Sequence, residues 1–449
     1  MTPRLPLLLF IPTFTAPLAA QAPPVTPDPA VAAAVDRVSA TRLETVLRTL
    51  VGFGTRHTLS DTLSPTRGIG AARRYVHAEF ERISRECGGC LSVRYQQTLL
   101  PAGSSRRVDR DVNLVNVLAE LRGTVHPDRR ILMTAHLDSR ASDVMDRAGE
   151  APGANDDGSG VAAVLEAARV LTGHRWGKTL VFGVLVGEEQ GLLGAGALAA
   201  MARDSGWTIE GVLNNDIVGG RAGMNGAAND SAFRIFSEPV PQTGTDQDRV
   251  SRRFDGGEVD GPSRQLARYA ARVARRHVPG LDPVLIYRLD RFGRGGDHRA
   301  FNDLGFTAVR FTEMNEDYRR QHQNIRLEDG IQYGDLLEGI SYPYLAGITR
   351  ANVAVLAELA QAPPPPDSVR IRGAVSPSTT LRWHRVPSPR LAGYRVYWRE
   401  TTASQWQWSR WVGDVSEATL ENVVIDNYLF GVAAVSGEGD ESVVVTPYR

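Results

Sequence analysis

The chain has 449 residues, which is enough for one large domain and a second, smaller one. Its 51 basic and 51 acidic residues give a formal net charge of zero, so composition does not favour a protein that binds nucleic acid or an anionic membrane surface. A hydrophobic content of 42% fits a globular protein.

The N-terminal segment is typical of a secretory signal peptide, which we place at residues 1–21. Arg4 supplies a positive start, residues 7–14 supply an apolar stretch, and the alanines within residues 19–22 form a small-residue cleavage region. The apolar stretch is too short to span a bilayer, and no later segment approaches the roughly 20 apolar residues that a span needs. We therefore expect a secreted or periplasmic protein without a membrane span; a disordered or membrane-anchored tail is the alternative.

Patterns typical of helices and strands alternate from residue 35 to residue 359. The predicted helices cover residues 35–49, 69–86, 161–171, 195–202, 262–277 and 339–359. The predicted strands cover residues 91–100, 113–121, 131–136, 180–186, 211–216 and 306–312. Residues 22–34, rich in Pro and Ala, are expected to form an extended lead-in. This order predicts an α/β fold with a mostly parallel, mixed sheet flanked by helices, in which ligands gather at the carboxyl ends of the strands.

The two cysteines of the chain, Cys87 and Cys90, form an ECGGC motif. In an oxidising compartment a small local disulfide is the simplest interpretation. Free thiols and a redox or metal role are the alternatives, although no second cysteine pair exists to complete a zinc site.

The composition changes after four prolines at residues 363–366, which predict a stiff, extended linker. Residues 367–449 hold five of the seven tryptophans and contain short alternating runs typical of a β-sandwich. LRWHRV, GYRVYWRE and YLFGVAAV resemble a fibronectin type III domain. That resemblance implies that Trp383 is the buried aromatic and that Tyr428 stands at a tyrosine corner; an irregular β tail is the alternative.

The role of this second domain is open at the level of sequence. Trp406, Trp408 and Trp411 offer an aromatic patch for a polymer or a cell surface. We favour the other interpretation, in which some of these rings pack in the sandwich; the domain could also act as a spacer.

Acids and histidines stand at the ends of apolar runs or in loops beside them, in the segments ILMTAHLD, GANDDGSG, LVFGVLVGEE, GVLNND and YRRQHQ. The residues concerned are His136, Asp156, Glu188, Glu189, Asp216 and His322. Because buried parallel strands end at one rim of a sheet, we expect these side chains to meet there. Two imidazoles and several carboxylates suit zinc, with one carboxylate left over as a base.

Each of these residues also has an ordinary structural interpretation. Asp156 and Asp157 precede a helix, where aspartate is a common cap, and His322 lies in a polar loop. Glu188 and Glu189 are less ordinary, because adjacent side chains point differently and one can bind metal while the other holds the attacking water.

HLDS, GANDDGSG, GEEQGLLGA, NND and the later GDHRAF together resemble the M28 family of zinc peptidases, which includes secreted bacterial leucine-type aminopeptidases. The resemblance covers residues 36–360, within an expected peptidase domain at residues 22–362. It implies two zinc ions, bound by His136, Asp156, Glu189, Asp216 and His322. One zinc is implied on His136 and Asp216, the other on Glu189 and His322, with Asp156 as the bridge.

The same resemblance implies the catalytic residues. Glu188 is the general base, which takes a proton from the bridging water and passes it to the leaving amine. Asp138 orients His136 through a carboxylate two residues away. A cis peptide bond between Asp156 and Asp157 is also implied. The substrates would be peptides with a free N-terminus.

This sequence departs from the family pattern at the last histidine. The family commonly has an aromatic residue followed directly by His, but here Arg319 and Arg320 follow Tyr318 and the histidine stands at position 322. His298, in the separate GGDH motif, is the competing ligand. We favour His322.

Two other functions compete with a zinc aminopeptidase. One is a single-zinc enzyme similar to glutaminyl cyclases, and the other is a catalytically inactive binding protein. Substrate preference depends on a pocket floor expected from residues 219–262 and 312–320. A group of basic residues flanks the expected site and offers to hold a substrate carboxylate or an acidic side chain: Arg291, Arg294, Arg319 and Arg320.

Overall fold

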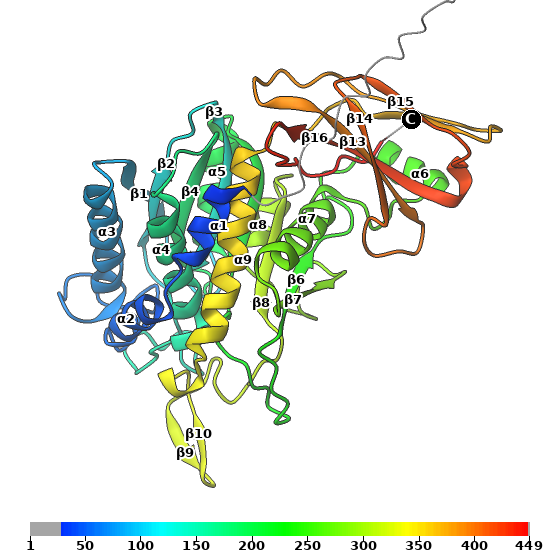
Figure 1. Cartoon of the computed structure of the whole chain (residues 1–449). Helices are drawn as coiled ribbons and strands as arrows, with labels where there is room; N and C mark the ends of the chain where they lie inside the picture. The colour runs from blue at the N-terminus through cyan, green and yellow to red at the C-terminus, as the bar shows by residue number, and fades with distance from the viewer. Residues whose placement is uncertain (1–27, 448–449) are drawn as a thin grey trace, which may run out of the picture.

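A computed structural model of the chain describes residues 28–447, and the predicted export signal at residues 1–21 lies outside them. An eight-stranded sheet forms the centre of the molecule (Figure 1). Across the sheet the strands are β1 (Leu91–Leu100), β2 (Val112–Leu121), β4 (Lys178–Leu185), β3 (His126–His136), β5 (Thr208–Asn215), β8 (Ala308–Glu313), β6 (Ala232–Ser237) and β7 (Asp282–Ile286). The central strands β4, β3, β5 and β8 are mutually parallel, while β1, β2 and β6 pair in antiparallel fashion. The predicted mixed, mostly parallel sheet is confirmed.

Helices cover both faces of this sheet. One face carries α1 (Pro29–Asp36), α2 (Ala40–Val51), α3 (Gly68–Glu86), α4 (Gly160–Leu171), α7 (Pro262–His277) and α9 (Tyr342–Gln361). The other face carries α5 (Leu193–Asp204) and the short α8 (His298–Asn302). Alternate residues of β3 pack into the two layers, with Ile131 and Met133 facing α4 and α9 and Leu132 facing α5. Burial on both faces explains why the strand is apolar throughout.

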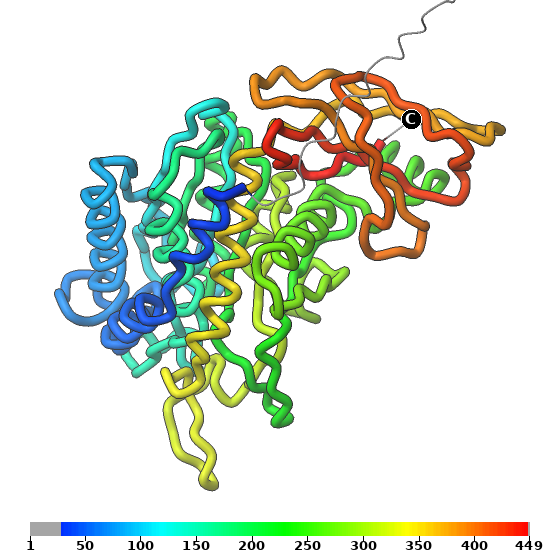
Figure 2. Tube along the Cα trace, in the orientation of Figure 1, coloured from blue at the N-terminus to red at the C-terminus, as the bar shows by residue number. Residues whose placement is uncertain are grey.

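The N-terminal prediction was wrong in detail. The segment expected as one helix, 35–49, is divided between α1 and α2, and α1 begins inside the expected extended lead-in. Asp28 caps α1 at the N–H of Ala30, and Ser39 caps α2 at the N–H of Arg42. The N–H of Ser39 also donates to Glu166, which fixes the break. Figure 2 shows α1 lying along α9, over 300 residues later in the chain.

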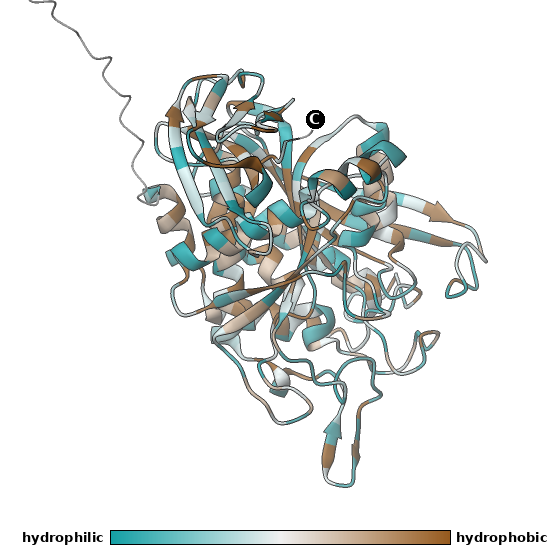
Figure 3. Ribbon diagram, turned by 90° about the vertical axis from the view of Figure 1, so that its right-hand side faces the viewer, coloured by the Kyte–Doolittle hydropathy of each residue, from teal (hydrophilic) through white to brown (hydrophobic). Residues whose placement is uncertain are grey.

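A hairpin of β9 (Arg326–Glu328) and β10 (Ile331–Tyr333) projects from one end of the molecule, at the bottom in Figure 1 and Figure 3. A 3-10 turn, η2 (Leu337–Gly339), leads from it into α9. This hairpin, β6, β7 and the exposed α6 (Asp246–Asp255) were not among the predicted elements.

Two three-stranded antiparallel sheets form the C-terminal domain. One contains β11 (Arg370–Arg372), β12 (Thr379–Arg382) and β15 (Glu417–Leu420); the other contains β14 (Trp408–Gly413), β13 (Leu391–Glu400) and β16 (Tyr428–Ser436), which follows the turn η3 (Ile425–Asn427). Trp383 is buried between them against Tyr394, as predicted, and the all-β architecture is confirmed. Tyr428 lies edge-on to Trp408 and Phe430.

Strand β13 is covered on both faces. Tyr394 and Val396 point into the sandwich core, while Arg395, Tyr397 and Arg399 point the other way, toward the large domain. There Arg399, fully buried, forms two 2.7 Å contacts with the carboxylate of Asp260 at the start of α7. The sandwich is therefore joined to the larger domain through a buried ion pair.

The sandwich docks at the amino ends of the central strands. His126, the first residue of β3, contacts Ser388, and Lys178, the first residue of β4, donates to the carbonyl oxygen of Pro363. The prolines at 363–366, where a stiff, extended linker is predicted, are mostly buried against the protein. Within residues 28–447, no helix is both long and apolar enough to cross a membrane.

The three tryptophans considered as a surface patch are partly covered, with Trp406 and Trp411 half-buried. Trp406 packs against Tyr397 and Arg399, next to the large domain. Trp408 stacks on Trp398 and remains 39% exposed.

Candidate metal centre

The carboxyl ends of the central strands deliver the predicted site residues to one rim of the sheet. His136 is the last residue of β3, Glu188 and Glu189 follow β4, and Asp216 directly follows β5. Two further residues come from irregular segments. Asp156 lies in the turn η1 (Ala154–Ser159) before α4, and His322 lies in the loop after β8.

Asp156 lies between the two histidines. Its Oδ1 is 3.2 Å from Nε2 of His136, and its Oδ2 is 3.1 Å from Nε2 of His322. On the far sides, Asp216 Oδ1 lies 4.0 Å from His136 Nε2, and Glu189 Oε1 lies 3.0 Å from His322 Nε2. The carboxylate of Asp156 therefore lies between two pairs of side chains, His136 with Asp216 and His322 with Glu189.

These side chains fit two adjacent metal positions. Two groups have donor atoms that all lie within 4.8 Å of one another: His136, Glu188 and Asp216, and Asp156, Glu189 and His322. The buried Nε2 of His136 lies 3.2 Å from Asp156 but forms no hydrogen bond of adequate geometry with any described residue, as expected of an atom directed at an ion. Imidazole nitrogens and carboxylate oxygens are ligands that zinc takes.

Backbone hydrogen bonds hold the predicted site residues in place. The carboxylate of Asp157 accepts from the N–H groups of His136 (3.1 Å), Gly160 (3.1 Å) and Ile217 (3.2 Å), so it joins the ends of β3 and β5 to the start of α4. The peptide bond between Asp156 and Asp157 is cis, as the family resemblance implies.

Asp138 contacts the site in two ways. Its carbonyl oxygen lies 2.9 Å from Nδ1 of His136, while its carboxylate is 3.7 Å away from that atom. The carboxylate instead accepts from the N–H groups of Glu188 and Glu189, at 3.3 and 3.0 Å. Asp138 therefore positions both the histidine and the pair of glutamates.

The close packing of acids and histidines shifts the pKa values of two site residues, His322 and Glu188. Burial disfavours the charged form of His322, but Glu189 and Asp156 outweigh it and raise the pKa of the imidazole to about 10. Burial also raises the pKa of Glu188 well above its usual range, although His136 opposes this. A protonated histidine and a neutral glutamic acid are the forms that an incoming cation would change.

Two buried carboxylates near the site were missed at the sequence level. Neither oxygen of Asp297 has a hydrogen-bond partner among the described residues, and burial raises its pKa to about 7. Asp335 accepts from the N–H groups of Asn155 and Asp156. Asp297 directly precedes His298 in the GGDH motif, so the sequence offered a signal for it. Nothing in the sequence distinguishes Asp335.

His298, the competing ligand, lies outside the cluster. Its Nε2 lies 2.8 Å from the carbonyl oxygen of Leu289 and 3.7 Å from Asp290. The structure thus brings His322, and not His298, to the other site residues.

The basic residues that flank the site are already paired with acids. Arg291 and Arg294 contact the carboxylate of Glu316. Arg319 and Arg320 contact the carboxylate of Asp317. A substrate carboxylate would have to compete with these internal partners.

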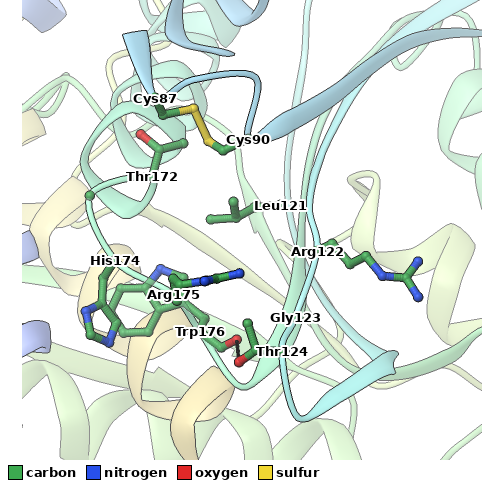
Figure 4. A pocket seen from close by; sticks show the side chains of 11 residues that line it. Cys87, Cys90, Leu121, Arg122, Gly123, Thr124, Thr172, His174, Arg175 and Trp176 are labelled. Carbon is green, nitrogen blue, oxygen red and sulfur yellow. Dashed lines mark hydrogen bonds between the residues drawn. A yellow bond between two sulfur atoms is a disulfide. The ribbon is translucent and has the colours of Figure 1, made fainter. Parts of the chain in front are cut away.

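A cavity of about 720 Å³ lies elsewhere, near the amino end of β4 (Figure 4). It is lined by Cys87, Cys90, Leu121, Arg122, Gly123, Thr124, Thr172, Gly173, His174, Arg175 and Trp176. Cys87 and Cys90 form the disulfide that was favoured from the sequence. The cavity shares no residue with the metal centre.

Comparison with known proteins identifies the family. Residues 116–335, which contain every predicted site residue, match the model of peptidase family M28. A probable zinc metalloprotease of Leptosphaeria maculans is 43% identical over 94% of this chain and 97% of its own length. The chain belongs to peptidase family M28.

Another relative and two solved structures are also similar to the chain. A probable zinc metalloprotease of Pyricularia oryzae is 40% identical to this M28 chain over 94% of the chain and 85% of the relative. Among solved structures, the LapA aminopeptidase of Legionella pneumophila matches with a TM-score of 0.54 at 17% identity, covering 76% of this chain and 77% of LapA. A leucine aminopeptidase precursor of Bacteroides thetaiotaomicron matches with a TM-score of 0.51 at 17% identity, covering 72% of this chain and 98% of that structure. These structural matches establish the shared fold.

Proposed function

We propose that the protein is a secreted aminopeptidase that uses two zinc ions to remove the first residue of a peptide. The observation that carries this proposal is the position of Asp156, whose two oxygens each face a different histidine, at 3.2 and 3.1 Å. A carboxylate between two ligand pairs is suited to bridge two cations. The names of the relatives, probable zinc metalloproteases, and of the neighbouring aminopeptidases support the choice of metal and reaction.

The proposed ligand assignment is the one that the family resemblance implies, and the short distances around Asp156 support it. His136 and Asp216 would hold one zinc, Glu189 and His322 would hold the other, and Asp156 would bridge them. Zinc bound there would polarise the scissile carbonyl and make the attacking water more acidic. The free amine of the substrate would bind near the metals, which would restrict attack to the first peptide bond.

Glu188 is the proposed general base. It takes a proton from the attacking water and delivers it to the leaving amine. Its backbone N–H donates to the carboxylate of Asp138 at 3.3 Å, which holds Glu188 beside the proposed metal positions, and burial raises the pKa of its carboxyl.

Export is part of the proposal. The basic start, apolar stretch and small-residue region at residues 1–21 and the Cys87–Cys90 disulfide both support an oxidising location outside the cytoplasm.

The test combines zinc content with the release of p-nitroaniline from a panel of aminoacyl-p-nitroanilides. We expect about two zincs per chain and, in Glu188→Gln, a loss of activity of about 10²- to 10⁴-fold with the zinc retained. The panel would also name the preferred first residue. One zinc per chain and no release from any substrate would contradict the proposal, and cyclisation of N-terminal glutamine would then be measured.

A further inference from the structure

A buried ion-pair chain begins at Asp216, one of the proposed zinc ligands. Arg310, on β8, is fully buried, and its guanidinium lies 2.8 Å from Asp216 Oδ1 and 3.2 Å from Asp290 Oδ2. The same guanidinium donates to the carbonyl oxygens of Asp216 and Gly295. Arg310 therefore fixes both the side chain and the backbone of the ligand.

The chain continues toward the loop after β8. Arg291 bonds to Asp290 at 3.1 Å and to Glu316 at 3.2 Å. The carboxylate of Glu316 also accepts from Arg234 and Arg294. Three arginines thus converge on one carboxylate whose side chain is only 2% exposed.

The last link reaches the second histidine. The side-chain amide of Gln321 donates to Glu316 at 3.1 Å, and its oxygen accepts from Arg294 at 3.2 Å. Gln321 is 5% exposed and directly precedes His322. Charges of opposite sign therefore alternate from Asp216 to the residue beside His322.

His322 needs such an anchor. It lies in no helix or strand, and its backbone φ is +54°, a left-handed value that a residue other than glycine adopts at a cost unless its surroundings hold it. Its neighbours Tyr318 and Arg320 are partly or well exposed, whereas the buried Gln321 connects this turn to Glu316 and Arg294.

We infer that Arg310, Asp290, Arg291, Glu316 and Gln321 are positioning residues that set where His322 stands relative to Asp216, and thereby tune zinc affinity at a distance. This inference rests on the proposed two-zinc function. None of the links between Asp290 and Gln321 is itself a proposed zinc ligand. Outer partners that orient metal ligands commonly change metal affinity by about 10- to 100-fold when they are lost.

The test uses two variants that touch no ligand. Glu316→Gln keeps the shape of the side chain and removes the charge on which the arginines converge. Gln321→Met leaves every ion pair intact and removes only the two hydrogen bonds to the loop. Zinc dissociation constants are measured on metal-free protein by competition with a chromophoric chelator, and thermal unfolding is followed in parallel.

We expect both variants to weaken the zinc position completed by His322 by about tenfold or more. The control is Glu210→Gln, which breaks a similarly buried ion pair with Lys178 and Arg129 near the opposite end of β5. It is expected to lower thermal stability while leaving both zinc constants unchanged. Should Glu316→Gln fail to fold, Gln321→Met alone decides the matter.

The outcomes separate the two ideas. Wild-type protein that binds two zincs, together with a folded Gln321→Met variant whose zinc constants match the wild type, would overturn the inference and leave the proposed function standing. Wild-type protein that binds a single zinc would contradict the proposed function. The positioning role would then stand or fall on whether Gln321→Met weakens that one site.

Discussion

The carboxylate of Asp335 accepts a hydrogen bond from the backbone N–H of Asp156 at 2.7 Å, although the two residues lie 179 positions apart. It also accepts from the N–H of Asn155, so one buried acid holds the turn that presents the proposed bridging carboxylate. In the chain, His322 precedes the β9–β10 hairpin and Asp335 follows it.

Asp335→Ala is therefore expected to lower activity and zinc content together. The variant leaves two buried N–H groups without an acceptor, which costs about 1–3 kcal/mol for each group and frees the turn to move. Zinc content after dialysis and kcat/KM would be measured side by side. A variant that keeps its full zinc content and activity would show that Asp335 is not needed to hold Asp156 in place.

Asp260→Asn tests the connection between the two domains. Asp260 lies between the buried guanidinium groups of Arg268 and Arg399, and removal of its charge leaves both without that carboxylate. Loss of one partner of a buried pair typically costs about 3–5 kcal/mol, so we expect a large fall in the unfolding temperature. Differential scanning calorimetry would report it.

The matched control is Asp414→Asn, which removes a carboxylate from a solvent-exposed pair with Arg385 in the same domain. It should leave the unfolding temperature close to that of the wild type. If Asp260→Asn behaved in the same way, the buried pair would not be what joins the domains.

Zinc binding is expected to weaken as the pH falls. In metal-free protein the pKa of His322 is raised to about 10, so zinc must displace a proton at neutral pH. One displaced proton makes affinity at this position fall by about tenfold for each unit of pH below that value. Competition titrations at pH 7, 8 and 9, corrected for the chelator, would measure the slope, and a flat profile would contradict it.

The free energy of unfolding of the metal-free protein should fall as the pH rises, whereas zinc affinity should increase. The folded pKa of His322 lies above the value of roughly 6.5 expected for an unfolded chain, so its protonated form stabilises the fold fully below that lower value. This contribution is lost as the pH rises through about 10. Unfolding of chelator-treated protein across this range, compared with His322→Gln, would isolate it.

The disulfide is expected to matter little for catalysis. Cys87 and Cys90 are three residues apart, and chain entropy assigns so small a loop a stabilisation of only about 2 kcal/mol. The doubly substituted variant, Cys87→Ser with Cys90→Ser, should lose no more than this and keep its kcat/KM. A large loss of activity would show that the adjoining cavity communicates with the metal centre.

Three residues of the candidate metal centre could be predicted from the sequence because each ends or follows a largely apolar, buried strand, and such strands are recognisable one at a time. His136, Glu189 and Asp216 could be placed in this way. Asp335 and Arg310 could not, since the contacts that give them a role join segments far apart in the chain.

The docking of the sandwich was hidden for a different reason. Arg395, Tyr397 and Arg399 alternate with apolar residues along β13, which is the usual pattern of a strand with one face in water. The polar face is in fact buried: Arg399 pairs with Asp260 of the large domain, and Arg395 pairs with Glu441 of the sandwich itself, which in turn contacts Arg272 of α7. A pattern of polarity does not distinguish a solvated charge from one that has a buried partner.

The shared ion pair between Asp260 and Arg399 also bears on how this protein evolves. A recombination event that moved the sandwich onto another catalytic unit would carry a fully buried guanidinium to a surface that lacks its carboxylate. The recombinant protein would be less stable at once, because a buried charge without its partner lowers the free energy of unfolding. The two units are therefore expected to be inherited together, and a substitution at either residue to be accompanied by a change at the other.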